Sequence, residues 1–136
     1  MLMSVSLERT QEISFLCKNL LSIEKIICAS VVNNRGKIIE SEFKNNILNL
    51  SDTELEMLYM QRALQTSMIK ELDCKLGKWS YTITDRDFIV EIIIPFDDGM
   101  IFIAAESGIK IHNLIPQIHE IIDASIDIET KESVSC

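Results

Sequence analysis

A catalytic or metal site in this 136-residue chain would have to be built from its histidines, cysteines and clustered acids. The two histidines, His112 and His119, are seven residues apart. On a helix this spacing puts them on one face but two turns apart, about 10 Å along the axis. They are too far apart to hold one metal ion without ligands from elsewhere. We interpret them as surface or helix-end histidines.

Two short charged turns are the remaining acidic candidates. Residues 97–99 (Asp-Asp-Gly) could begin a cation-binding loop, but the alternating acids of a calcium loop do not follow. Residues 85–87 (Asp-Arg-Asp) form a second charged turn, which we interpret as solvated. Neither turn predicts a metal site.

The four cysteines are far apart in the sequence and form no Cys-x-x-Cys pair. We interpret Cys17, Cys28, Cys74 and Cys136 as small buried hydrophobic side chains or incidental thiols, with no zinc site. The glycines form neither a dinucleotide-binding fingerprint nor a phosphate-binding loop. We therefore predict no catalytic residue, no metal and no cofactor, and we expect the protein not to be an enzyme.

Charge and hydrophobicity narrow the range of partners. The formal net charge is −8, and no run of Lys and Arg offers the basic patch that nucleic acids or anionic membranes require. No apolar run approaches the roughly 20 residues that span a bilayer, and the N-terminus lacks the pattern of a signal peptide. We expect a cytoplasmic protein that binds neither nucleic acid nor membrane.

The clearest element is a helix predicted over residues 51–72. Ser51 and Glu54 form a capping box at its start. The helix carries two apolar faces, and a helix with two such faces needs a second partner. We predict that this partner is a second copy of the chain; the alternative is that loops or the C-terminal tail cover the second face. The first face consists of Met57, Met60, Leu64, Met68 and Leu72.

We expect this methionine-rich face to lie on the sheet, and the opposite face to meet the partner subunit. An interface tolerates polar groups better than a core does, which suits Arg62 and Thr66 on that side. Under this assignment Leu58→Glu should give a folded monomer, whereas Leu64→Glu should unfold the protein. The predicted dimer interface is Leu55, Leu58, Tyr59, Arg62, Thr66 and Ile69, with Trp79 and Tyr81 as aromatic anchors from an edge strand.

The remaining pattern predicts terminal helices over residues 7–21 and 113–126, and five strands between them. The first and last strands, residues 26–32 and 100–105, are apolar on both faces, so they should be central neighbours. This predicts an α/β/α sandwich in the α+β class, with a five-stranded antiparallel sheet of order 2-1-5-4-3. The long helix should cover one sheet face and the terminal helices the other. The other strands are predicted over residues 37–43, 79–84 and 88–94, in a single domain over residues 1–126 with a flexible tail over 127–136.

This element order, with the hairpin ICASVVNNRGKIIES, resembles the roadblock/LC7 superfamily and the related profilin-like and longin-like domains. The stretch MQRALQTSMIKELDCKLGKWSYTITDRD looks more specifically like a family of small archaeal proteins with no assigned function. The roadblock resemblance implies a homodimer in which crossover helices pair and third strands meet edge to edge. It also implies a platform for small Ras-like GTPases or a scaffold subunit.

We therefore expect a dimeric protein-interaction module without enzymatic activity, with a small GTPase as one candidate partner. The alternative is a small-ligand sensor with an apolar pocket between sheet and helix, as in PAS-like domains. Fold resemblance alone does not carry function with it.

Overall fold

The computed structural model describes residues 2–44 and 48–126, with only the backbone described for residues 2–6. The predicted flexible tail, residues 127–136, lies outside the described residues. The bounds of the elements are as follows: α1 Leu2–Leu21, β1 Ile26–Val32, β2 Ile38–Phe43, α2 Asp52–Lys70, α3 Asp73–Leu76, β3 Thr82–Asp85, β4 Ile89–Phe96, β5 Gly99–Glu106 and α4 Ile111–Ser125.

The five strands form one antiparallel sheet of order β2-β1-β5-β4-β3, which confirms the predicted topology. All seven residues of β1 are buried, and β5 is buried except for its last residue. Strands that are apolar on both faces can be stable only where both faces are covered, so these two occupy the centre. The edge strand β2 has no buried residue.

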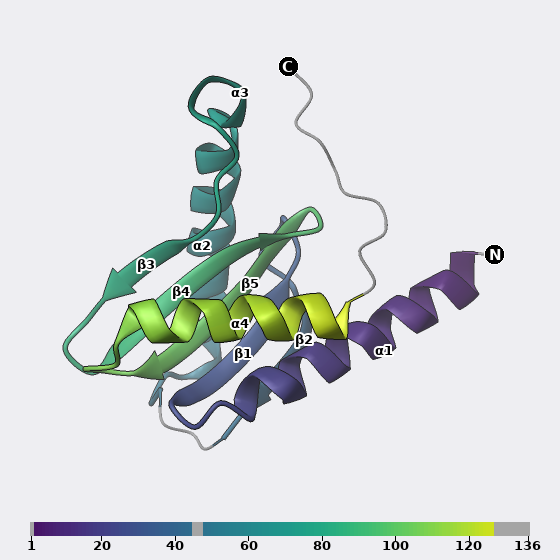
Figure 1. Ribbon diagram of the computed structural model, residues 1–136. Coiled ribbons are helices and arrows are strands. Elements are labelled where there is room, and N and C mark those ends of the chain that lie inside the picture. The colour runs from purple at the N-terminus through teal and green to yellow at the C-terminus, as the bar shows by residue number, and fades with distance from the viewer. Residues whose placement is uncertain (1, 45–47, 127–136) are drawn as a thin grey trace.

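The sheet is covered unequally on its two faces (Figure 1). The helices α1 and α4 lie together on one face, where they contribute Leu16, Leu20, Leu114 and Ile118 to the larger hydrophobic core. On the other face α2 lies alone, and the hydrophobic cluster beneath it is smaller. The predicted sandwich of helices on both faces is confirmed.

Several elements begin or end away from their predicted positions. α1 starts at Leu2, five residues before the predicted start at residue 7. β4 continues through Pro95 although a stop was predicted there. Pro95 pairs only with Met100 of β5, and the pairing of β4 with β3 begins at Ile93, so the missing proline N–H breaks no ladder bond. α4 begins at Ile111, two residues earlier than predicted.

The end of α2 stands clear of the sheet. The short helix α3 follows it at the projecting tip, and an extended segment then returns to β3 (Figure 1). Gly77 makes this reversal with φ +97° and ψ 159°, a conformation that only glycine adopts readily. Because of this excursion β3 begins at Thr82 rather than at residue 79.

Candidate functional site

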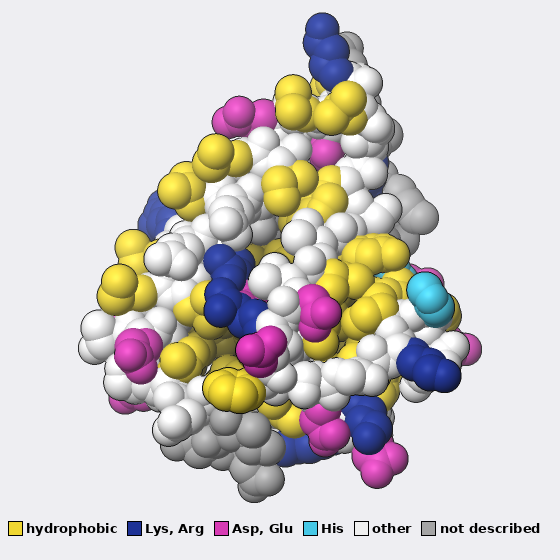
Figure 2. Space-filling view, turned by 90° about the vertical axis from the view of Figure 1, so that its left-hand side faces the viewer, with side chains coloured by type: hydrophobic (Ala, Val, Ile, Leu, Met, Phe, Trp, Pro, Cys, Tyr) yellow, Lys and Arg dark blue, Asp and Glu magenta, His cyan; other side chains and the backbone are white. Residues whose placement is uncertain are grey.

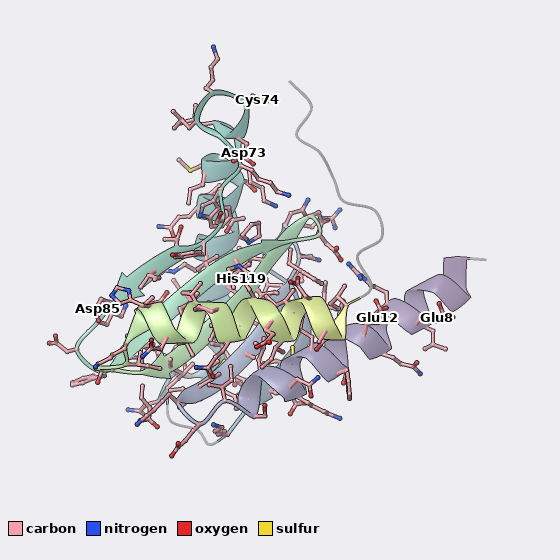
Figure 3. The ribbon with its side chains drawn as sticks, viewed as in Figure 1. Glu8, Glu12, Asp73, Cys74, Asp85 and His119 are labelled. Carbon is pink, nitrogen blue, oxygen red and sulfur yellow. The ribbon has the colours of Figure 1, made fainter. Side chains whose placement is uncertain are left out.

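The histidines and acids singled out in the sequence do not converge. His112 is exposed, and His119 lies beside the ring of Tyr81 with 6.3 Å between the ring centroids. In Figure 3, Asp73 and Cys74 lie at the projecting tip, far from His119. No group of three or more potential metal ligands occurs among the residues whose placement is described.

The acidic turn between β4 and β5 is tied to α1 rather than open to a ligand. Asp97, at φ +52°, accepts a hydrogen bond of 2.6 Å from Arg9. The same arginine lies 5.1 Å from the ring centroid of Phe96. This arrangement holds α1 against the end of the sheet and supports the interpretation of residues 97–99 as structural.

The two buried cysteines do not behave as nucleophiles. Cys17 and Cys28 are buried and unpaired. Burial raises the pKa of Cys17 to about 12 and that of Cys28 to about 11, so both stay protonated at neutral pH. Cys74, by contrast, is exposed on α3, so of the two interpretations given for the cysteines the buried side chain does not apply to it.

The inward face of α2 carries three buried polar side chains, contrary to the expectation that the methionines would lie on the sheet. Tyr59, Arg62 and Thr66 are all buried beneath the helix. The Tyr59 hydroxyl shares a hydrogen bond of 2.7 Å with the hydroxyl of Ser30 on β1. The Thr66 hydroxyl lies 3.7 Å from the sulfur of Met100 on β5. Specific polar contacts therefore seat α2 on the sheet.

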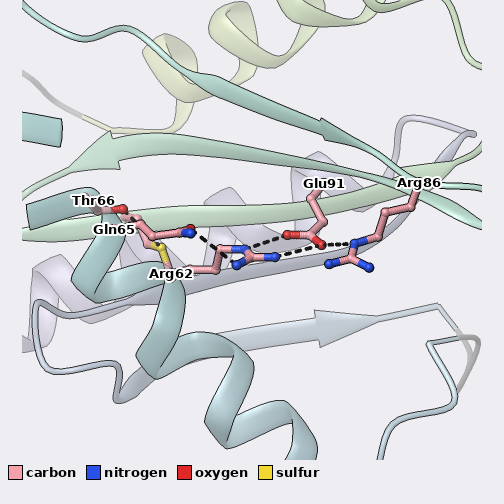
Figure 4. Close-up of polar contacts among 6 residues, drawn as sticks. Arg62, Gln65, Thr66, Arg86 and Glu91 are labelled. Carbon is pink, nitrogen blue, oxygen red and sulfur yellow. Dashed lines mark hydrogen bonds and ion pairs between the residues drawn. The ribbon is translucent and has the colours of Figure 1, made fainter. Parts of the chain in front are cut away.

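An ion network forms the centre of this seat (Figure 4). Arg62 donates from Nε to Glu91 Oε1 at 2.8 Å and from Nη2 to Oε2 at 3.2 Å. Arg86 donates from Nε to the same Oε2 at 2.9 Å, although its side chain is 57% exposed. Arg62 also reaches Gln65 Oε1 at 3.3 Å. The turn at residues 85–87, interpreted as merely solvated, thus supplies one arm of a buried network.

Sequence reasoning missed Glu91 as the partner of Arg62. Glu91 is 2% exposed and lies in β4, otherwise a run of apolar residues. A lone carboxylate in such a run has to be paired with a cation, because burying an isolated charge is too costly. That signal was present in residues 88–94 (FIVEIII) and predicts a cation beside Glu91, but it does not say which residue supplies the cation.

The outward face of α2 is the apolar one, which reverses the predicted assignment of faces. Its large side chains are between 52 and 63% exposed. Hydrophobic side chains run up the molecule towards its projecting tip in Figure 2. This outward face, named by its residues, is Met57, Met60, Leu64, Met68 and Leu72.

The eight residues predicted for a dimer interface are therefore distributed differently. Tyr59, Arg62 and Thr66 are buried against the chain's own sheet, so their assignment to the outer face is corrected. Leu55, Leu58 and Trp79 are partly buried and pack against the cluster under α2, and Ile69 and Tyr81 stay accessible at 36 and 40% exposed.

The hairpin turn between β1 and β2 packs closely against α2. Gly36 has φ +84°, and a Cβ atom placed there would lie 2.8 Å from Met60 Cα. No larger residue fits this contact without displacing the helix. The turn glycine of the sequence resemblance therefore fixes the position of α2 over the hairpin.

None of the helices in the described part of the chain is both long and apolar enough to cross a membrane. Polar contacts therefore hold α2 on the sheet, and the outward face of the helix exposes apolar side chains.

Comparison with solved structures identifies proteins with the same fold. A roadblock/LC7 domain from Streptomyces avermitilis is 9% identical, with a TM-score of 0.64, and the match covers 82% of this chain and 92% of that chain. Myxococcus xanthus MglB is 11% identical, with a TM-score of 0.69 and coverage of 90 and 96%. The gliding protein MglB from Thermus thermophilus is 10% identical, with a TM-score of 0.61 and coverage of 87 and 88%. The chain has the roadblock/LC7 fold, as the resemblance predicted.

No curated protein matches the sequence. A family model does match, over residues 8–130, which is most of the chain. That the family is archaeal, as the sequence resemblance implied, stays a prediction. The chain belongs to the family of unknown function DUF6659.

Proposed function

We propose that this protein is a homodimeric, non-enzymatic interaction module in which the outward face of α2 meets a second copy. The observation that carries the proposal is the inverted character of α2. Tyr59, Arg62 and Thr66 are buried towards the sheet, with Leu55 and Leu58 packed beside them, whereas the large apolar side chains of the outward face are exposed. Exposed apolar surface of this extent is characteristic of an interaction site.

A second copy is a suitable occupant because α2 is the only helix on its face of the sheet within the described residues (Figure 1). Two such helices can pack against each other through the same face around a two-fold axis, which gives each the partner it lacks. Ile69 and Tyr81, from the predicted interface, stay part of the proposal: Ile69 is accessible on α2, and Tyr81 precedes β3, with its ring beside His119 of α4. β3 is an edge strand, so its free side is open to edge-to-edge pairing.

Light scattering across a dilution series tests the dimer. We expect a mass near twice 15.5 kDa for the wild type. Leu64→Glu should give a monomer, because it places a charge at the middle of the outward face. Phe15→Glu is the matched control: Phe15 is 59% exposed against 63% for Leu64, but lies on α1, on the other side of the sheet. A wild type that stays monomeric at every concentration contradicts the proposal.

The finer part of the proposal is that the dimer serves as a platform for a small Ras-like GTPase. It rests on the roadblock/LC7 fold and is tested with a Ras-like GTPase from the same organism. Calorimetric titration of the dimer with the GTP-loaded and GDP-loaded forms should show binding that prefers one nucleotide state. Absence of binding in both states removes the GTPase while leaving the dimer in place. No observation among the described residues favours the alternative of a ligand sensor.

A further inference from the structure

Charge is unevenly distributed along the α2–α3 unit. Asp52, Glu54 and Glu56 lie at its N-terminal end, whereas Lys75 and Lys78 are exposed at the projecting tip. Neither lysine forms an ion pair with any residue that the structure describes. In a protein with a net charge of −8, this leaves two accessible cations at one end of the proposed interface and three acids at the other.

Two acids, Glu71 and Asp73, also lie near these lysines, but they do not outnumber the positive charges of this segment. Asp73 Oδ1 accepts a hydrogen bond from the backbone N–H of Trp79 at 3.2 Å, which holds the returning chain against α3. Glu71 is exposed. Lys70 is also present and reaches the carbonyl of Gly99 at 3.4 Å. With three lysines against two acids, the segment over residues 70–78 has a formal charge of +1.

The orientation of two paired α2 helices decides which charges meet. Leu64 lies at the middle of the outward face: Lys75 follows it by 11 residues and Thr53 precedes it by 11. In an antiparallel pair centred on Leu64, the tip that follows the end of α2 at Lys70 in one subunit lies towards the first turns of α2 in the other. A parallel pair would set lysines against lysines and acids against acids. Charge complementarity therefore favours the antiparallel pair.

We propose that the α3 tip of each subunit clasps the acidic first turns of the other subunit's α2, through Lys75 and Lys78. The tip reaches past the sheet, so it is free to extend along a second molecule (Figure 1). Leu72 and Leu76 on this tip are 52 and 77% exposed and supply an apolar base for the contact. The inference rests on the proposed function, since it specifies how the homodimer is held and oriented.

The clasp makes dimer affinity depend on salt, because exposed ion pairs are screened. The dissociation constant of the dimer is measured by sedimentation at about 0.05 M and about 0.5 M salt. We expect K75E/K78E to weaken the dimer about tenfold or more at the lower salt concentration, and to remove most of the salt dependence. Adding D52K/E56K to that variant reverses both ends together and should restore the affinity.

The matched control is K18E/K110E, which changes the net charge equally. Both lysines are exposed, on α1 and at the start of α4, across the sheet from α2. Circular dichroism checks that every variant is folded. If K75E/K78E dimerises as tightly as this control, the clasp is wrong; if Leu64→Glu still gives a monomer, the proposed dimer stands. If the wild type is monomeric, both fall.

Discussion

Glu91 is the central residue of the ion network that holds α2 on the sheet. Its carboxylate is shared by two arginines, one buried and one largely exposed. If Arg62 is removed, Glu91 keeps Arg86. If Glu91 is removed, Arg62 is left buried with only Gln65 at 3.3 Å. The network is therefore asymmetric, and its members should differ in how much stability their loss removes.

We predict that Glu91→Leu lowers the free energy of unfolding by about 3 kcal/mol, because it strands a buried guanidinium. Arg62→Met should cost less, about 1–2 kcal/mol, since the carboxylate keeps one charged hydrogen bond. The double variant R62M/E91L should be more stable than E91L alone. Urea unfolding at one fixed protein concentration measures all three. Strictly additive losses would contradict a network.

The buried thiols predict a weakness at alkaline pH. Burial raises the pKa of Cys17 and Cys28 from 9.0 to about 12 and about 11, and burial also raises that of Tyr59. Below pH 9 the thiols are protonated in both states, so they do not affect the balance. Between pH 9 and 12 the unfolded thiols ionise while the folded ones do not, which favours unfolding.

We therefore expect the melting temperature to fall as pH rises above 9, the ordinary pKa of these thiols. A C17A/C28A variant, scanned from about pH 8 to about pH 11, should show a shallower fall than the wild type. Tyr59 accounts for part of what remains. Equal slopes in the two proteins would mean that the thiols ionise alike in both states.

At the scale of elements, strand order could be predicted because β1 and β5 carry apolar residues on both faces. That pattern has one stable location, the centre of a covered sheet. The ends of the elements were harder to predict from the sequence. β3 begins late because the chain first makes the α3 excursion at Gly77, and the sequence marks that glycine without giving its conformation.

The face of α2 that lies on the sheet could not be chosen from hydrophobicity alone. The helix offers two apolar faces, and the more apolar one turned outward. What decides is the set of partners on the sheet, Ser30 for Tyr59 and Glu91 for Arg62. Those pairs depend on register between elements far apart in the sequence, which one sequence does not fix.

The reversal of faces exchanges the two expected mutational outcomes. Leu64→Glu now puts a charge on an exposed position, so the chain should stay folded with near-native circular dichroism. Leu58→Glu puts a charge against the cluster under α2, where Leu58 is partly buried, and should destabilise the fold by about 2–3 kcal/mol. Chemical unfolding of both variants decides between the two assignments. If Leu64→Glu is less stable than Leu58→Glu, the original assignment of the faces is supported.

For the whole molecule, the unequal cover of the sheet is the property with most consequence for function. One face is closed by α1 and α4, which pack over the larger core. The other face carries one helix, held by a few polar contacts and apolar on the outside. In a monomer, the large apolar side chains of this outward face are exposed to water, and burying them would be favourable.

If that exposed face is buried in a dimer, stability must depend on protein concentration, because association favours the folded state by mass action. We predict that the wild-type melting temperature rises with concentration, while that of Leu64→Glu does not. The two proteins should approach each other at high dilution, where the wild type dissociates. Differential scanning fluorimetry over a wide range of concentrations measures this, with Phe15→Glu expected to follow the wild type. A wild-type melting temperature that does not vary with concentration would mean that a single chain is stable with its apolar helix face in water.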